Sequence, residues 1–167
     1  MEHAIPALVL AAIIVVSGVI LAGVTNSSVD SVGQSWRDME ALSEERIGTD
    51  LTVVSTDVTG GGADLTVVLS NEGRTAIQEP ALMDLIINYA DTGDERHVLW
   101  LPHTDSNPPG DNQWTVDSIS GDYRNHGIFD GGEQMTVKIH LNPATKDGPE
   151  RWLVLATDAG VAYTIYF

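Results

Sequence analysis

The feature that most constrains this chain is an uncharged apolar run at its N-terminus. From Ala4 to Val24 the sequence AIPALVLAAIIVVSGVILAGV contains no charged residue. A helix rises about 1.5 Å per residue, so a run of this length reaches about 30 Å, the thickness of the hydrocarbon core of a bilayer. We therefore expect a helix that can cross a membrane. An ordinary secretory signal has a basic n-region, a shorter apolar stretch and a small-residue cleavage site, and this run does not fit that description.

Beyond this run the pattern becomes amphipathic and predicts that the helix continues to about Arg46. Residues placed at 100° intervals form one stripe along the whole helix, small at first and larger later. Its members are Ala4, Ala7, Ala11, Gly18, Ala22, Val29 and Trp36, and Val32 and Met39 extend the packing surface beside it. Small residues let helix backbones approach closely in lipid, so we expect this stripe to pack helices together. Plain membrane anchoring, which needs only apolar residues, is the alternative.

After Gly48 the hydrophobic pattern changes to a period of two residues, which is typical of half-buried strands. The candidate strands are LTVVSTDV, ADLTVVLS, LMDLIINY, RHVLWL, TVDSI, MTVKIHL, WLVLAT and VAYTIYF. Turn-rich stretches such as TGGGAD and SNPPGDN separate them, as in an antiparallel sandwich. The sequence thus predicts an α+β chain: a long N-terminal hydrophobic helix over residues 1–47, then an all-β, immunoglobulin-like antiparallel sandwich head over residues 48–167.

The charge of the chain excludes several classes of partner. The net charge is −16, and residues beyond 46 carry −12 of it. Such a chain repels nucleic acid and anionic headgroups, so we expect no nucleic-acid partner. The sequence has no cysteine, which excludes disulfides and thiolate metal ligands.

No pattern in the sequence points to catalysis, a cofactor or a metal. The chain lacks a P-loop, a nucleophile elbow and a dinucleotide fingerprint. The histidines are scattered without ligand spacing, and the acidic loop Asp91–Glu95 is interpreted as a solvated turn rather than a calcium site. Asn26 begins an Asn-Ser-Ser glycosylation sequon. We expect Trp100, Trp114 and Trp152 to be core or subunit-contact aromatics rather than a ligand face.

An uncharged, helix-long N-terminus that runs without a loop into an all-β head resembles the type IV pilin-like proteins. Within them the chain is similar to archaellins, the filament subunits of the archaeal swimming organelle, and their accessory pseudopilin relatives. The segments that carry the resemblance are ALSEERIGTDLTVVS, LTVVLSNEGRTAI and FDGGEQMTVKIHL. Bacterial type IV pilins have a glutamate at the fifth mature position, whereas this chain has Ile5 and Glu2, which favours the archaellum side.

The resemblance implies a structural role without enzyme activity. The chain would polymerise with itself into an extracellular helical filament on the cell surface, after transient membrane insertion. A prepilin-type peptidase and an assembly platform are the implied partners. Two alternatives stay open. One is a membrane-anchored accessory protein whose sandwich binds a surface-layer protein, and the other is an adhesion pilin.

Overall fold

The computed structural model describes residues 13–17 and 32–167 of the 167-residue chain. Residues 13–17 and 32–48 are helical, so the predicted helix is present where it is described and ends two residues beyond Arg46. The rest of the predicted helix, including Ala4, Ala7, Ala11, Gly18, Ala22, Val29 and the sequon at Asn26, lies outside the described residues. Among the described helices, none has the length and apolar character that a membrane crossing requires.

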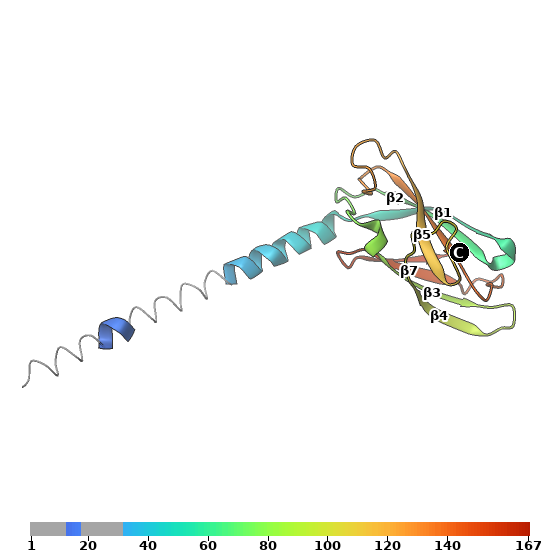
Figure 1. Ribbon diagram of the computed structural model, residues 1–167, viewed down its shortest axis with the longest axis horizontal. Coiled ribbons are helices and arrows are strands. Elements are labelled where there is room, and N and C mark those ends of the chain that lie inside the picture. The colour runs from blue at the N-terminus through green and yellow to red at the C-terminus, as the bar shows by residue number, and fades with distance from the viewer. Residues whose placement is uncertain (1–12, 18–31) are drawn as a thin grey trace, which may run out of the picture. The chain divides into compact units, whose positions relative to one another are not determined.

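The chain divides into two compact units, Met1–Ser43 and Glu44–Phe167. The second unit, called the head below, contains all the strands of the described residues and two short 3₁₀ turns, η1 and η2. Figure 1 shows these elements in chain order by colour. Their bounds are β1 (Leu51–Thr59), η1 (Gly60–Gly62), β2 (Asp64–Asn71), η2 (Pro80–Leu82), β3 (Asp84–Ala90), β4 (Arg96–Leu101), β5 (Gln113–Ser120), β6 (Gln134–His140), β7 (Trp152–Ala156) and β8 (Ala162–Tyr166). Each of the eight strands corresponds to one of the eight candidates in the sequence.

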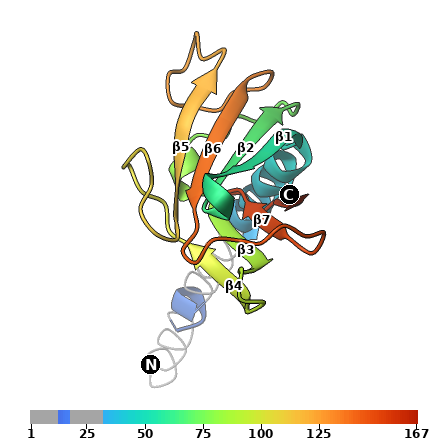
Figure 2. The ribbon, with the colours of Figure 1, turned by 90° about the vertical axis from the view of Figure 1, so that its right-hand side faces the viewer.

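The strands form two four-stranded antiparallel sheets, with the orders β1-β2-β6-β5 and β4-β3-β7-β8. Figure 2 shows β5, β6, β2 and β1 side by side in the first sheet. This is the strand order of an immunoglobulin sandwich with one extra strand beside the third. The head is therefore the antiparallel sandwich that the period-2 pattern predicts, formed without a disulfide.

The core lies between the two sheets and consists of every second residue of the central strands. In the first sheet Leu65 pairs with Ile139 and Val67 with Val137, and all four side chains are buried. In the second sheet the corresponding buried positions are Leu85, Ile87 and Tyr89 on β3 and Leu153 and Leu155 on β7. Antiparallel strands send alternate side chains to opposite faces, so these residues form one continuous apolar layer.

The β1–β2 hairpin turns at Gly60–Gly62, as the TGGGAD stretch predicts. All three glycines have positive φ angles, a conformation that other residues adopt with strain. At Gly62 a Cβ atom would also collide with the backbone carbonyl of Thr145. The position therefore requires glycine for both its conformation and its close approach to the next loop.

Candidate assembly surfaces

The helical residues 32–43 expose large apolar side chains along one side. Val32, Trp36 and Met39, called the helix seam below, are 55%, 69% and 65% exposed. Burying a side chain of this size removes apolar area from water, which stabilises a contact by about 1.5–3 kcal/mol per residue. These three side chains are thus exposed on the described helix, and their packing against other helices stays a prediction. Ile13, Ile14, Val15 and Val16 in the other described helical segment are exposed as well.

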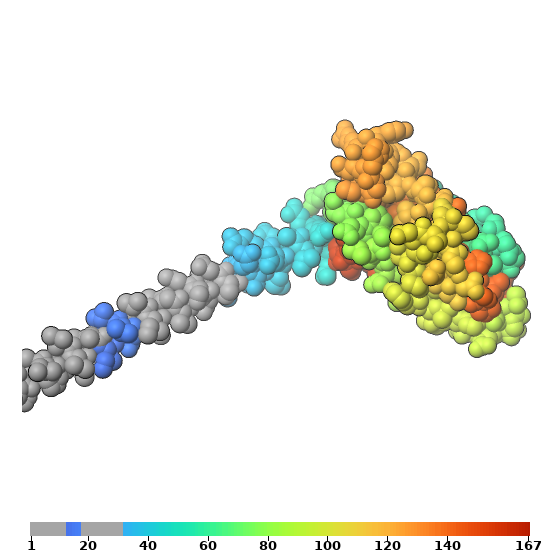
Figure 3. Space-filling view, viewed as in Figure 1, coloured from blue at the N-terminus to red at the C-terminus, as the bar shows by residue number. Residues whose placement is uncertain are grey.

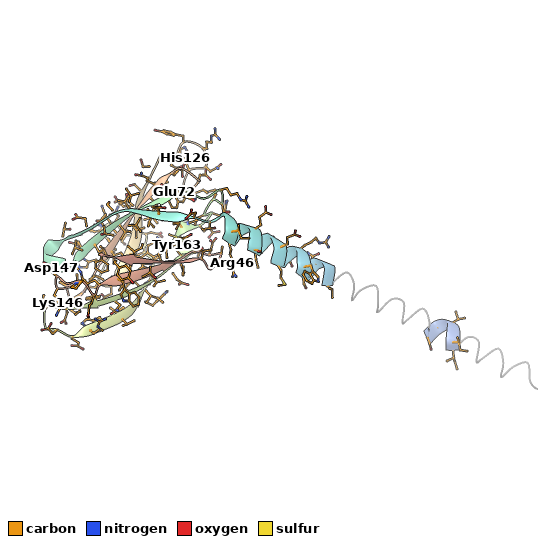
Figure 4. All side chains as sticks on the ribbon, turned by 180° about the vertical axis from the view of Figure 1, so that it is seen from behind. Arg46, Glu72, His126, Lys146, Asp147 and Tyr163 are labelled. Carbon is orange, nitrogen blue, oxygen red and sulfur yellow. The ribbon has the colours of Figure 1, made fainter. Side chains whose placement is uncertain are left out.

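Residues 44–48 form the end of the helical segment and belong to the head. Loops of the sandwich hold these residues in place. Arg46 donates from Nε to the carbonyl of Ala159 at 2.7 Å, and Thr75 donates from Oγ1 to the carbonyl of Glu45 at 3.2 Å. Tyr163 on β8 donates its hydroxyl to the carbonyl of Thr49 at 3.1 Å, and its partial burial raises the pKa of the phenol. In Figure 4 the labelled Arg46 lies at the opposite end of the head from Lys146 and Asp147. Residues 44–49 are therefore a fixed part of the head.

The buried side chain of Asn71 ties β2 to two loops. Its Nδ2 donates to the carbonyls of Thr75 at 2.9 Å and Phe129 at 3.0 Å, and its Oδ1 accepts from the amide of Gly73 at 3.0 Å. The residue is 0% exposed. Asn71 begins the N-x-G motif in the second segment that carries the archaellin resemblance, so the motif has a structural role at the end of the head that holds residues 44–49.

A small acidic cluster lies at the hairpin between β3 and β4. The ligand atoms of Asp91, Glu95 and His97 all lie within 4.8 Å of one another, a spacing that can hold a metal ion. Asp91 Oδ1 accepts the amides of Gly93 and Glu95, and Asp91 Oδ2 lies 3.1 Å from His97 Nε2. These hydrogen bonds, led by the one from His97, hold the pKa of the Asp91 carboxyl below its usual range. The sequence identified the acidic turn but not the approach of His97, which depends on the hairpin register.

The other histidines lie in separate places, as their spacing in the sequence indicates. His140 Nδ1 lies 2.7 Å from Asp64 Oδ1 on the first sheet, and His126 Nδ1 lies 3.4 Å from Asp122 Oδ1 in the β5–β6 loop. Figure 3 shows this loop standing out from the surface of the head. His103 makes an edge contact with Trp114, with ring centroids 4.8 Å apart. The described histidines are thus engaged by neighbouring acids or aromatic rings in separate parts of the head, and His140 also lies 3.6 Å from Asp111 through Nε2.

One cavity of the head carries mixed charges. A cavity of about 450 Å³ at the far end of the head is lined by the basic residues Arg96, Lys146 and Arg151 together with acids. Arg96 pairs with Glu150 at 2.6 Å, Arg151 lies 3.6 Å from Asp147, and Lys146 pairs with Asp94. Since each base faces an acid, this cavity offers no excess charge to an ionic ligand.

The three tryptophans of the sandwich divide into core and surface. Trp114 on β5 is fully buried, whereas Trp152 on β7 is half-buried and Trp100 on β4 is 60% exposed. The sequence expectation of core or subunit-contact aromatics thus holds for Trp114 as a core residue. Trp100 and Trp152 lie on the side of their sheet that faces away from the core.

The fold is similar to those of solved archaellum proteins. The archaellum periplasmic stator protein FlaG from Sulfolobus acidocaldarius matches with a TM-score of 0.51 and 16% identity, over 71% of this chain and 99% of that one. A chain of the FlaF–FlaG stator complex from the same organism matches with a TM-score of 0.50 and 16% identity, over 70% and 87%. The archaeal flagellum of Methanospirillum hungatei strain JF1 matches with a TM-score of 0.51 and 15% identity, over 93% of this chain and 89% of that one.

No protein-family model matches the chain, and no curated protein sequence matches it. The likeness is therefore one of fold, at identities that sequence comparison alone does not detect. It confirms the archaellin-like resemblance that the sequence segments suggested. The matched proteins are described as archaellum stator proteins and an archaeal flagellum.

Proposed function

We propose that the chain is a structural subunit of an archaellum-type filament on the cell surface. In this proposal the N-terminal segment sits in the membrane before assembly and then joins a bundle of helices from neighbouring subunits. The heads surround that bundle. The stripe that includes Ala4, Ala7, Ala11, Gly18 and Ala22 would set the close approach of the helices.

The observation that carries the proposal is the exposure of the helix seam. A helix with Val32, Trp36 and Met39 in water leaves apolar area unburied, and a neighbouring helix is the partner that this periodicity fits. The match to the Methanospirillum hungatei filament supports the same proposal, because the match extends over 93% of this chain. In a filament, head-to-tail contacts repeat without closing and so generate an open helix.

An accessory role in the archaellum is the second candidate. FlaG, described as a stator protein, has a TM-score equal to that of the filament match and is covered over 99% of its chain. In this role the anchored sandwich would bind a surface-layer protein and would not polymerise into the fibre. A third candidate function is that of an adhesion pilin with the same N-terminal helix and sandwich head.

Electron microscopy of material sheared from the cell surface separates these roles. If the chain is the filament subunit, the fibres contain it as their principal polypeptide, and deletion of the chain abolishes them. If the chain is accessory, the fibres consist of another polypeptide and this chain stays in the membrane fraction. That second result would overturn the proposal.

A pair of matched variants tests the helix seam itself. Trp36→Glu places a charge on the seam, whereas Gln34→Glu places the same charge at an exposed position off the seam. We expect Trp36→Glu to lose fibres and Gln34→Glu to keep them, with equal amounts of both in the membrane fraction. Equal fibre yields from the two variants would count against helix packing through this seam.

A further inference from the structure

One basic side chain differs from every other in the described part of the chain because it has no partner. The chain has eight lysine and arginine residues, and all eight lie within the described residues. Five of them form ion pairs with carboxylates, Arg46 donates to a backbone carbonyl, and Arg37 donates to Gln34. Arg124 is exposed and makes no ion pair or side-chain hydrogen bond with any described residue. In a chain of net charge −16, this cation is free to attract a carboxylate from outside.

Arg124 lies in the β5–β6 loop, residues 121–133, beside another side chain suited to a protein contact. Tyr123 is 89% exposed, the largest value among the exposed apolar and aromatic residues described. Asn125 Nδ2 donates to Asp130 Oδ2 at 2.8 Å across the loop and limits its motion. A loop held in one conformation loses less entropy on binding. Tyrosine and arginine are also among the residue types that dominate the energies of protein interfaces.

The strand register places this loop at one end of the head. Gln134 begins β6 and pairs with both Ser120 on β5 and Ser70 on β2. Leu51 begins β1 and pairs with Asn71, the residue after Ser70. The β5–β6 loop therefore leaves the first sheet at the end of the head where β1 begins, which we call the loop end.

The opposite end of the head, called the far end, carries the β3–β4 hairpin. The amide of Lys146 donates to the carbonyl of Ala90 at 2.9 Å, and the amide of Thr145 donates to the carbonyl of Gly62 at 2.9 Å. The end of β3 therefore lies beside the β1–β2 turn, which is the end of β1 away from the loop end. Strands of eight residues separate the two ends by about 25 Å.

The β3–β4 hairpin has an acid that is free in the same sense as Arg124. Asp91 lies 3.1 Å from His97, and Asp94 pairs with Lys146. Glu95 is exposed and forms no ion pair with any residue that the structure describes. Each head thus has a free cation at the loop end and a free carboxylate on the far-end hairpin.

We propose that Tyr123 and Arg124 of one head contact the β3–β4 hairpin of the next head in the filament, where Arg124 pairs with Glu95. The contact rests on the proposed function, because it needs copies of the chain in a row. The occupant is a second copy because one chain holds both charges, and it holds them at opposite ends. An open head-to-tail row joins two different surfaces of each subunit, so the loop end of one head meets the far end of its neighbour.

The ion pair sets the orientation of the contact more than its strength. An exposed pair stabilises little, because water and salt screen it, and complementary charges mainly select the partner and its orientation. The planar guanidinium of Arg124 fits a carboxylate through two parallel hydrogen bonds. The Tyr123 ring adds apolar area that is buried only when the next head covers it. The contact therefore acts inside the assembly, where it repeats at every subunit.

Cysteine cross-linking in the full chain tests the contact, because the chain has no native cysteine. A double variant with His126→Cys and Thr92→Cys places one exposed thiol at each end and leaves Arg124 and Glu95 in place. The ends are about 25 Å apart, so a short bis-maleimide joins neighbouring heads and not the two thiols of one head. Treated membranes and sheared fibres should give a ladder of dimer, trimer and longer products. The matched double variant with His126→Cys and Ser118→Cys, whose second thiol is exposed on the first sheet, should give none.

The outcomes separate this contact from the filament role. Fibres that contain the chain but give no ladder would overturn the contact and leave the filament role intact. A ladder in membranes of cells whose fibres lack the chain would support the contact and overturn the filament role. A dimer from His126→Cys alone would show two loop ends meeting and overturn the head-to-tail contact. A product with a different protein in place of the ladder would overturn the second copy as the partner.

Charge reversal tests the ion pair itself. We expect Arg124→Glu and Glu95→Arg each to lower the fibre yield severalfold, and the two changes together to restore it. Arg74→Glu makes the same change of charge at an exposed arginine of the loop end and should keep the yield. Thermal unfolding should be equal in all four variants. Single variants that match Arg74→Glu, or a double variant that stays as low as the single ones, would overturn the pairing of Arg124 with Glu95.

Discussion

Replacing Asn71 with alanine tests how the head is held together at the end of β2. The change removes three side-chain hydrogen bonds, to Thr75, Phe129 and Gly73, at a site with no exposed area. At about 1 kcal/mol net for each bond, the loss is about 3 kcal/mol of the free energy of unfolding. That is a large share of the 5–15 kcal/mol that stabilises a typical domain. For a domain of this size, about 3 kcal/mol lowers Tm by roughly 12 °C.

The assay is thermal unfolding of the purified full chain in mild detergent, followed by circular dichroism of the β signal. Asn125→Ala is the matched control, because Asn125 donates to Asp130 at 2.8 Å on an exposed loop. We expect the control to lie within about 0.5 kcal/mol of the parent, as most surface changes do. If Asn71→Ala unfolds within a few degrees of Asn125→Ala, the reasoning from buried hydrogen bonds is refuted.

Further predictions concern the hairpin, the head alone, the small-residue stripe and salt. For the hairpin, His97→Leu removes the first cause of the lowered pKa of Asp91, so an NMR titration should show this pKa rising toward 3.8. In the parent chain the pKa of Asp91 is lower in the folded state than in the unfolded state. The Asp91 carboxylate therefore stabilises the fold above the unfolded-state pKa, and this stabilisation is lost as the pH falls through the folded-state pKa. An acid unfolding midpoint that His97→Leu leaves unchanged would contradict this. Residues 44–167 expressed alone should give a soluble, monomeric, β-rich domain, and a helical spectrum or a polymer would count against it. Gly18→Leu should keep membrane insertion but block fibre formation, whereas Val16→Leu should leave both unchanged; equal fibre yields would favour plain anchoring. Fibres should weaken at low salt, because repulsion between acidic heads is screened within about 10 Å at 0.1 M ionic strength, and fibres that stay intact in deionised buffer would argue otherwise.

The strands of the head could be predicted from sequence because each has a half-buried pattern. In ADLTVVLS and MTVKIHL, apolar residues alternate with Ser, Thr and Lys, and the apolar set is the buried one. Alternation of this kind fixes which side of a strand faces the core without any knowledge of the sheet order. The glycine turn at Gly60–Gly62 is equally local, since positive φ angles call for glycine.

The apolar outward side of the second sheet could not be predicted, because the same rule fails where both sides of a strand are apolar. In RHVLWL, Leu99 and Leu101 point to the core while Val98 and Trp100 point to solvent, and their hydrophobicity does not distinguish the two sets. The surface becomes visible only when the register places β4 beside β3, and β7 beside β8. The approach of His97 to Asp91 and the burial of Asn71 against Phe129 depend on long-range pairing in the same way.

The composition of the first sheet shows that the fold does not require apolar residues on an outward surface. That sheet has the same number of strands as the second and packs against the same core, yet its outward residues are mainly Ser, Thr, Gln and ion pairs, with valines such as Val54 and Val68 among them. The large apolar side chains on the outward side of the second sheet are therefore not a consequence of the sandwich. In a free head they expose apolar area that favours nonspecific association. The helix seam, Val32, Trp36 and Met39, lies outside the head unit, so if the chain assembles as proposed, a charged substitution in the seam should weaken assembly without unfolding the head.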